Sequence, residues 1–257
     1  SSLALNAEID MMSRGVVSSI FKSVAVTACA GLLSVSAQAA QVTLVGTTIN
    51  YVYDDSQAAM ALFGAPTIVG DVVVFTPSSF SALSENGAGS VTTTSSFVFD
   101  RVYHQSGMAL ASLSVSEQGD YFIDGSGEVS VDLYLQGVTN PGGGTLGSGT
   151  AQTYWSENGN TNGAQTLWGP VTGTLDTTTF TQPFGGAPAG DQTDIKVTIQ
   201  NTLRAETAAD GTSDAFIQKK LNFVAVAAVP VPAAVWLFGS ALLGLLAVGR
   251  RKRAVAG

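Results

Sequence analysis

Apolar residues recur at every second position through much of the chain between residues 41 and 228. The clearest run is Val129, Val131, Leu133 and Leu135, whose intervening residues are polar or amphipathic. Because successive side chains of a strand point to opposite faces, this period of two is typical of strands with one buried face. About ten such runs, separated by Gly, Asn, Asp and Pro, predict an all-β fold, an antiparallel β-sandwich or jelly-roll-like domain.

Local patterns predict individual elements of this domain. We expect an opening strand or hairpin over 42–53, a short helix over 57–63 and a single strand over 68–75. Residues 121–135 predict a hairpin whose turn is the glycine-rich segment 124–127. Further strands are expected over 91–103, 109–116, 150–155, 166–168, 171–175, 178–184, 195–203 and 216–226.

The N-terminus has the order of a secretory signal peptide. A basic segment precedes an apolar run over 23–35, and residues 37–39 (Ala-Gln-Ala) fit an A-x-A cleavage site. We therefore expect a signal peptide over 12–39 that signal peptidase removes. The mature chain then begins at Ala40 or Gln41.

Two further features of this end concern processing. We interpret residues 1–11 as a start-site extension, because Met11 or Met12 supplies a start at the head of the signal peptide. The single cysteine, Cys29, loosely fits a lipoprotein lipobox, but the apolar run continues beyond it, which favours the A-x-A site. The mature chain then contains no cysteine, which excludes disulfides and thiol chemistry.

The mature region, taken as a domain over residues 40–228, is strongly acidic. It contains 17 acidic residues and five basic ones, a net charge near −12. The basic residues are Arg101, Lys196, Arg204, Lys219 and Lys220. Such a surface repels polyanions, so nucleic acid is not expected as a partner. It is compatible with solubility outside the cell, with divalent cations and with neutral sugars.

An apolar segment near the C-terminus lies between a proline motif and a basic cluster. The motif consists of Val229, Pro230, Val231, Pro232 and Ala233, and the cluster of Arg250, Arg251, Lys252 and Arg253. Residues 233–248 carry no charge, and at about 1.5 Å per residue they span roughly 24 Å, against a hydrocarbon core of about 30 Å. We expect one transmembrane helix that anchors the exported domain, with the basic cluster as its cytoplasmic stop.

These three parts, in this order, resemble the PEP-CTERM sorting signal, specifically its VPLPA-type (VPLPA-CTERM) variant. The resemblance covers residues 229–253 and includes the run AVWLFGS over 234–240. Val231 stands where the two forms carry Glu or Leu. The resemblance implies a Gram-negative exported protein that is an exosortase substrate, the exosortase being a membrane-embedded cysteine transpeptidase-like enzyme. It also implies association with extracellular polysaccharide and the biofilm matrix.

Acidic residues are densest around the predicted turn at 124–127. Glu117, Asp120, Asp124 and Glu128 are candidate ligands for Ca²⁺, which takes six to eight oxygen ligands. The other interpretation is that Asp124 serves the turn and the remaining carboxylates face water. The segment 158–163 (NGNTNG) resembles half of an EF-hand loop without its final Glu, so we expect left-handed turns there.

Three aromatic residues flank that segment: Tyr154, Trp155 and Trp168. Aromatic side chains on the rim of a sandwich stack on sugar rings, so these are the candidate carbohydrate contacts. The alternative is that the same rings pack in the core.

The sequence lacks the pattern of a catalytic site. His104 is the only histidine, no G-x-S-x-G motif occurs, and the ligands of a His-based zinc site are missing. We expect a non-enzymatic protein without a cofactor, calcium aside. It is exported across the inner membrane to the cell surface or extracellular matrix. The alternative function is a carbohydrate-binding module of that matrix.

Overall fold

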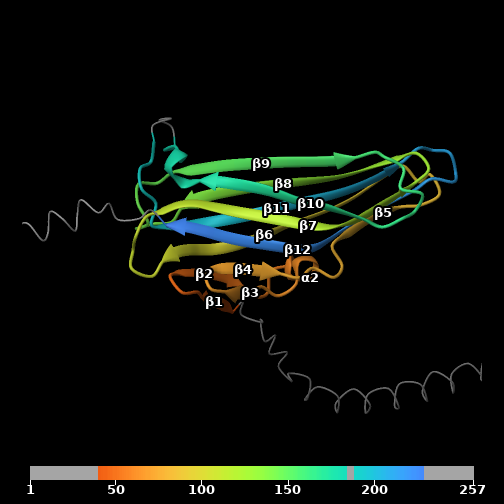
Figure 1. The fold of residues 1–257 in the computed structure, drawn as a ribbon. Coiled ribbons are helices and arrows are strands. Elements are labelled where there is room, and N and C mark those ends of the chain that lie inside the picture. Colours follow the sequence, from red (N-terminus) through yellow and green to blue (C-terminus); the bar gives the residue numbers. More distant parts are fainter. Residues whose placement is uncertain (1–39, 184–187, 229–257) are drawn as a thin grey trace, which may run out of the picture. The chain divides into compact units, whose positions relative to one another are not determined.

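The computed structural model describes residues 40–183 and 188–228, and this part of the chain is all-β. Two six-stranded antiparallel sheets lie face to face (Figure 1). The first sheet has the order β1 (Gln41–Val45), β2 (Ile49–Asp54), β6 (Ser90–His104), β11 (Asp194–Thr207), β8 (Gly127–Thr139) and β9 (Ser148–Glu157). The second has the order β10 (Thr166–Asp176), β7 (Leu110–Asp124), β12 (Asp214–Ala228), β4 (Val72–Phe75) and β3 (Thr67–Val69), and β5 (Ser81–Ser84) pairs with β12.

One core lies between the two sheets and takes residues from both of them. The alternating residues of β8 that predicted a strand, Val129 to Leu135, are all fully buried. One end of the core is aromatic, where Phe75 packs 4.8 Å from Phe97 and Phe63 packs 5.3 Å from Phe80, measured between ring centroids. This architecture confirms the predicted all-β, sandwich-like fold of two antiparallel sheets.

The predicted opening hairpin is confirmed as β1 and β2, in which Leu44 lies opposite Tyr51. The helix expected over 57–63 is confirmed only in its last turn, α2 (Met60–Phe63).

The predicted hairpin over 121–135 is wrong. β7 runs unbroken from Leu110 to Asp124 and pairs with β10 and β12, whereas β8 pairs with β11 and β9 in the other sheet. The turn between them therefore passes from one sheet to the other. Hydrogen bonds to the β11–β12 loop hold it there: Ser126 N donates to Ser213 Oγ at 2.9 Å, and Ala208 N donates to Ser126 O at 2.9 Å. Alternation identifies the buried face of a strand but not the neighbour it pairs with.

Two other expected strands are also corrected. The segment 68–75 is a tight hairpin of β3 and β4, because Gly70 adopts a φ of 63° that turns the chain back. Of the segment expected as a strand over 178–184, the described residues 178–183 form no strand beyond isolated bridges at Thr181. The segment begins in a short 3-10 helix, η1 (Thr177–Thr179), because the Asp176 carboxylate accepts hydrogen bonds from Thr178 N and Thr178 Oγ1.

The signal peptide over 12–39, the sorting motif and the transmembrane helix expected after it all lie outside the described residues. Within 40–183 and 188–228, no helix has the length and apolarity needed to cross a membrane.

Candidate site in the core between the two sheets

Three polar side chains meet inside the core. Glu117 comes from β7 and Lys219 from β12 in one sheet, and Asn201 comes from β11 in the other. All three residues have an exposed fraction of 0 %. A buried Lys, Glu and Asn in one cluster is unusual, because taking charged groups out of water is costly unless they are paired.

The pattern of each strand explains why these residues point inward. Glu117 continues the buried series of Leu113 and Val115, and Asn201 lies between the buried Ile199 and Leu203. In β12 the register with β7 shifts between Lys219 and Leu221. This bulge lets Lys219 and Asn222 both face the core although they are three residues apart.

The three side chains satisfy one another. Asn201 Nδ2 donates to Glu117 Oε2 at 2.7 Å, and Lys219 Nζ donates both to Glu117 Oε2 and to Asn201 Oδ1. Lys219 Nζ also lies 5.2 Å from the ring centroids of Phe63 and of Phe80, within reach of a cation–π interaction. The ammonium group is therefore held by one carboxylate, one amide oxygen and two aromatic faces.

The electrostatics of this cluster disfavour the charged form of Lys219. Burial lowers the pKa of Lys219, and the nearby Glu117 carboxylate only partly opposes that effect. Glu117 Oε1 and both side-chain amide atoms of Asn222 are buried without a hydrogen-bond partner. A buried polar atom without a hydrogen-bond partner costs free energy, so these three atoms are a locally unfavourable feature of the packing.

The four predicted calcium ligands do not form one site. Glu117 is paired with Lys219 inside the core, and Asp120, nearly buried, is paired with Lys220. Asp124 is exposed, and Glu128 accepts a hydrogen bond from Tyr154 Oη at 3.3 Å. Among the residues that the structure describes, no three His, Cys, Asp or Glu side chains lie together as a group able to hold a metal ion.

The segment 158–163 folds as turns, as its Asn and Gly content predicts. Asn162 has a φ of 50° and Gly163 a φ of 72°, both left-handed. Thr161 fixes the segment to β7, since Thr161 Oγ1 donates to Ile123 O at 3.0 Å and accepts from Ile123 N at 2.9 Å.

The three aromatic candidates for sugar contact do not share one surface. Trp168 is 2 % exposed, and its Nε1 donates to Gln218 O at 3.0 Å. Trp155 stacks on Trp168 with ring centroids 5.9 Å apart, and it packs against the core from a partly buried position. Tyr154 is 58 % exposed and, as the next residue along β9, points to the opposite face. The indoles therefore follow the core-packing interpretation.

His104 lies at the end of β6 and is 7 % exposed. Its Nδ1 accepts from Ser106 N at 3.1 Å and contacts Ser106 Oγ at 2.9 Å. In a catalytic triad Nδ1 would instead donate to a carboxylate. The hydrogen bonds of His104 therefore serve the turn that follows β6.

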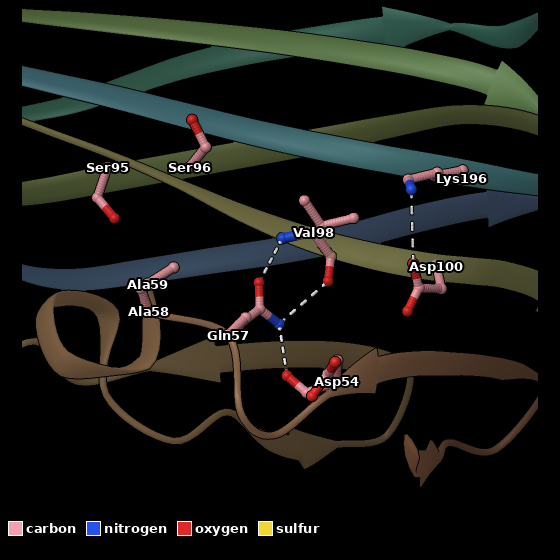
Figure 2. Close-up of a pocket in the computed structure, with 9 residues that line it drawn as sticks. All are labelled: Asp54, Gln57, Ala58, Ala59, Ser95, Ser96, Val98, Asp100 and Lys196. Atoms are coloured by element: carbon pink, nitrogen blue, oxygen red, sulfur yellow. Dashed lines mark hydrogen bonds and ion pairs between the residues drawn. The ribbon is translucent and has the colours of Figure 1, made fainter. Parts of the chain in front are cut away.

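A surface groove of about 420 Å³ lies beside β6, between α2 and Lys196 of β11 (Figure 2). At its base the Gln57 side chain takes the place of a strand partner for Val98. Gln57 Oε1 accepts from Val98 N at 2.9 Å, and Gln57 Nε2 donates to Val98 O at 3.2 Å and to Asp54 O at 3.0 Å (Figure 2). Lys196 pairs with Asp100 at 3.6 Å on the same side. Gln57, Lys196 and Asp100 of the groove are thus engaged in holding the fold.

Comparisons with known proteins add little to this geometry. No family model matches the chain, and no curated protein matches it. Among solved structures it is similar to the VP2 subviral particle of infectious bursal disease virus, with 15 % identity over 72 % of this chain and 52 % of the viral one, at a TM-score of 0.26. The Gx strain of the same virus gives 14 % identity over 73 % and 51 %, at a TM-score of 0.27. The chain spans about half the length of the viral chains it matches.

Sequence reasoning included Glu117 but missed Lys219 and Asn201. In the sequence, Lys219 and Lys220 look like two solvent-exposed basic residues near the end of a strand. The available signal was the phase of alternation, because Lys219 continues the inward series of Ala215 and Ile217.

Proposed function

We propose that this chain is an exported, non-enzymatic structural protein of the cell surface or extracellular matrix of a Gram-negative bacterium. The signal peptide over 12–39 directs its export, and the signal over 229–253 sorts it through an exosortase. The tie to extracellular polysaccharide or biofilm follows from the same resemblance of the tail.

The observation that supports this proposal is the position of the strand that enters the tail. β12 ends at Ala228, and the sorting motif begins at the next residue. β12 is an interior strand, paired with β7 from Asp214 to Ala228 on one edge and with β4 and β5 on the other. An interior strand leaves its sheet only when hydrogen bonds on both edges break. This strand is therefore a firm attachment point for a tail that is tethered or cut at the membrane.

Sorting is tested by expressing the full chain in a host with and without its exosortase gene. We expect a surface or medium fraction that depends on the exosortase and lacks the peptides of 234–253 in mass spectrometry. The double variant Pro230→Ala, Pro232→Ala is expected to accumulate in the membrane fraction, whereas Val231→Leu, which restores the VPLPA wording, is the matched control and should be sorted. A chain that still ends at Gly257 in exosortase-positive cells would contradict processing.

A further inference from the structure

The groups needed to join two side chains by an amide bond lie together in this core. They are the primary amine of Lys219, the carboxamide of Asn201 and the carboxyl group of Glu117, all without solvent exposure. From this arrangement we infer that Lys219 Nζ and Asn201 Cγ form an intramolecular isopeptide bond, with Glu117 moving the protons.

The nucleophile must be an uncharged amine. Lys219 Nζ contacts Glu117 Oε2, so a proton passes directly from the ammonium to the carboxylate. The transfer removes both buried charges, and burial, which lowers the pKa of Lys219, favours it. A neutral lysine in a desolvated pocket is a recognised form of activated nucleophile.

The electrophile is the carboxamide carbon of Asn201. Lys219 Nζ contacts Asn201 Oδ1, and Cγ is the atom to which that oxygen is bonded. Glu117 Oε2 also accepts a hydrogen bond from Asn201 Nδ2 at 2.7 Å. One carboxyl group thus reaches both the attacking nitrogen and the leaving nitrogen, which is the placement required of a general acid and base.

The step balances without any other reactant. The Lys219 ammonium gives one proton to the Glu117 carboxylate, and the amine attacks Asn201 Cγ to form the new C–N bond. The second amine proton moves through Glu117 to Nδ2, the Cγ–Nδ2 bond breaks, and ammonia leaves. The products are a secondary amide, one ammonia molecule and a protonated Glu117, and nothing is oxidised or reduced.

The surroundings protect this step from water. The phenyl rings of Phe63 and Phe80 lie 5.2 Å from Nζ, and both residues are fully buried. Excluded water neither competes for Cγ nor hydrolyses the finished amide.

The bond would give the structural role proposed above a specific device, and in that sense it rests on that role. Lys219 lies on β12, the strand that enters the tail, and Asn201 lies on β11 of the other sheet. The isopeptide bond ties the attachment strand covalently to the opposite sheet. A force applied to the tail is then transmitted through the bond to β11, and the loop between β11 and β12 is not extended.

Peptide mapping of the purified, denatured full chain tests the bond. Without it, trypsin releases residues 197–204 as a separate peptide. With it, trypsin does not cleave after Lys219, and 197–204 stays joined to 205–220 with a mass about 17 Da below the sum of the two peptides, because ammonia has left. A folded protein that yields the free 197–204 peptide as its main product overturns the inference.

Variants assign the roles. Lys219→Met, Asn201→Ala and the nearly isosteric Glu117→Gln should each yield the free peptide. Asn222→Ala, which removes a buried amide directly opposite Glu117, is the matched control and should keep the branched peptide. Equal branching in Glu117→Gln overturns the role of Glu117, and branching lost in Asn222→Ala but kept in Asn201→Ala overturns the choice of asparagine. Detection of the branched peptide needs neither an exosortase nor export. Its result is therefore independent of the result of the sorting assay.

Discussion

At the scale of single residues, the chemistry of this molecule is concentrated at Lys219. A lysine amine that is buried and unlinked binds its proton less readily in the folded chain than in the unfolded one. The unfolded state then holds more protons between the lowered pKa and the ordinary value of 10.5, so folding stability rises with pH across that window. An amide nitrogen has no such titration.

This difference predicts distinct pH profiles for Glu117→Gln and the wild type. Between the lowered pKa of Lys219 and its ordinary value of 10.5, the stability of the variant should approach that of the wild type as the pH rises, by up to about 1.4 kcal/mol per pH unit. Burial also raises the pKa of Tyr51, but that effect is common to both proteins and cancels in the comparison. Urea denaturation at each pH measures the difference, and parallel curves would contradict the linked state of Lys219.

A second prediction at this scale compares the contribution to stability of a core aromatic residue, Trp168, with that of an exposed one, Tyr154. Trp168→Ala should destabilise the fold by about 3–5 kcal/mol, because it leaves a cavity beside Trp155 and frees Gln218 O. Tyr154→Ala, which removes an exposed ring, should cost less than about 1 kcal/mol. Denaturant midpoints check both, and equal costs would refute the core assignment of Trp168.

At the scale of elements, Gln57 replaces a missing length of strand. β2 pairs with β6 only from Ile49 to Val52, opposite His104 to Arg101. Val98 lies beyond this pairing, and the carboxamide of Gln57 supplies the hydrogen bonds that a neighbouring strand would give. The backbone groups of Val98 are thereby unavailable for pairing with a further strand.

Removing this carboxamide should loosen the edge of β6. Gln57→Met keeps the length of the side chain but loses its three hydrogen bonds, with an expected cost of about 1–3 kcal/mol. Hydrogen exchange at the Val98 amide should accelerate. Gln152→Met is the matched control, because Gln152 makes only solvent-exposed hydrogen bonds, both to Asp132, and their loss should cost less than about 0.5 kcal/mol. Unchanged exchange at Val98 would argue against the role of Gln57.

At the scale of the whole molecule, the sequence allowed prediction of the class of fold but not the pairing of its strands. Strict alternation from Val129 to Leu135 marked a buried face correctly. It gave no sign that β7 and β8 belong to different sheets, because pairing is decided by contacts far apart in the chain. The core cluster was missed for a related reason: its three residues come from three strands and meet only in the folded chain.

The described residues form a two-sheet domain, and in the account proposed here β12, the last strand of that domain, is tied to the opposite sheet. Asn201 and Lys219 are 18 positions apart in the chain. When the protein is stretched between its ends, a bond between them shields residues 202–218 from extension.

Single-molecule force spectroscopy of the full chain tests this claim most directly, with Glu117→Gln as the reference. We predict that the wild type extends, on complete unfolding, to a contour length roughly 50–60 Å shorter than that of the variant, given about 3.6 Å per extended residue and the span of the linked side chains. Equal contour lengths in the two proteins would contradict the account.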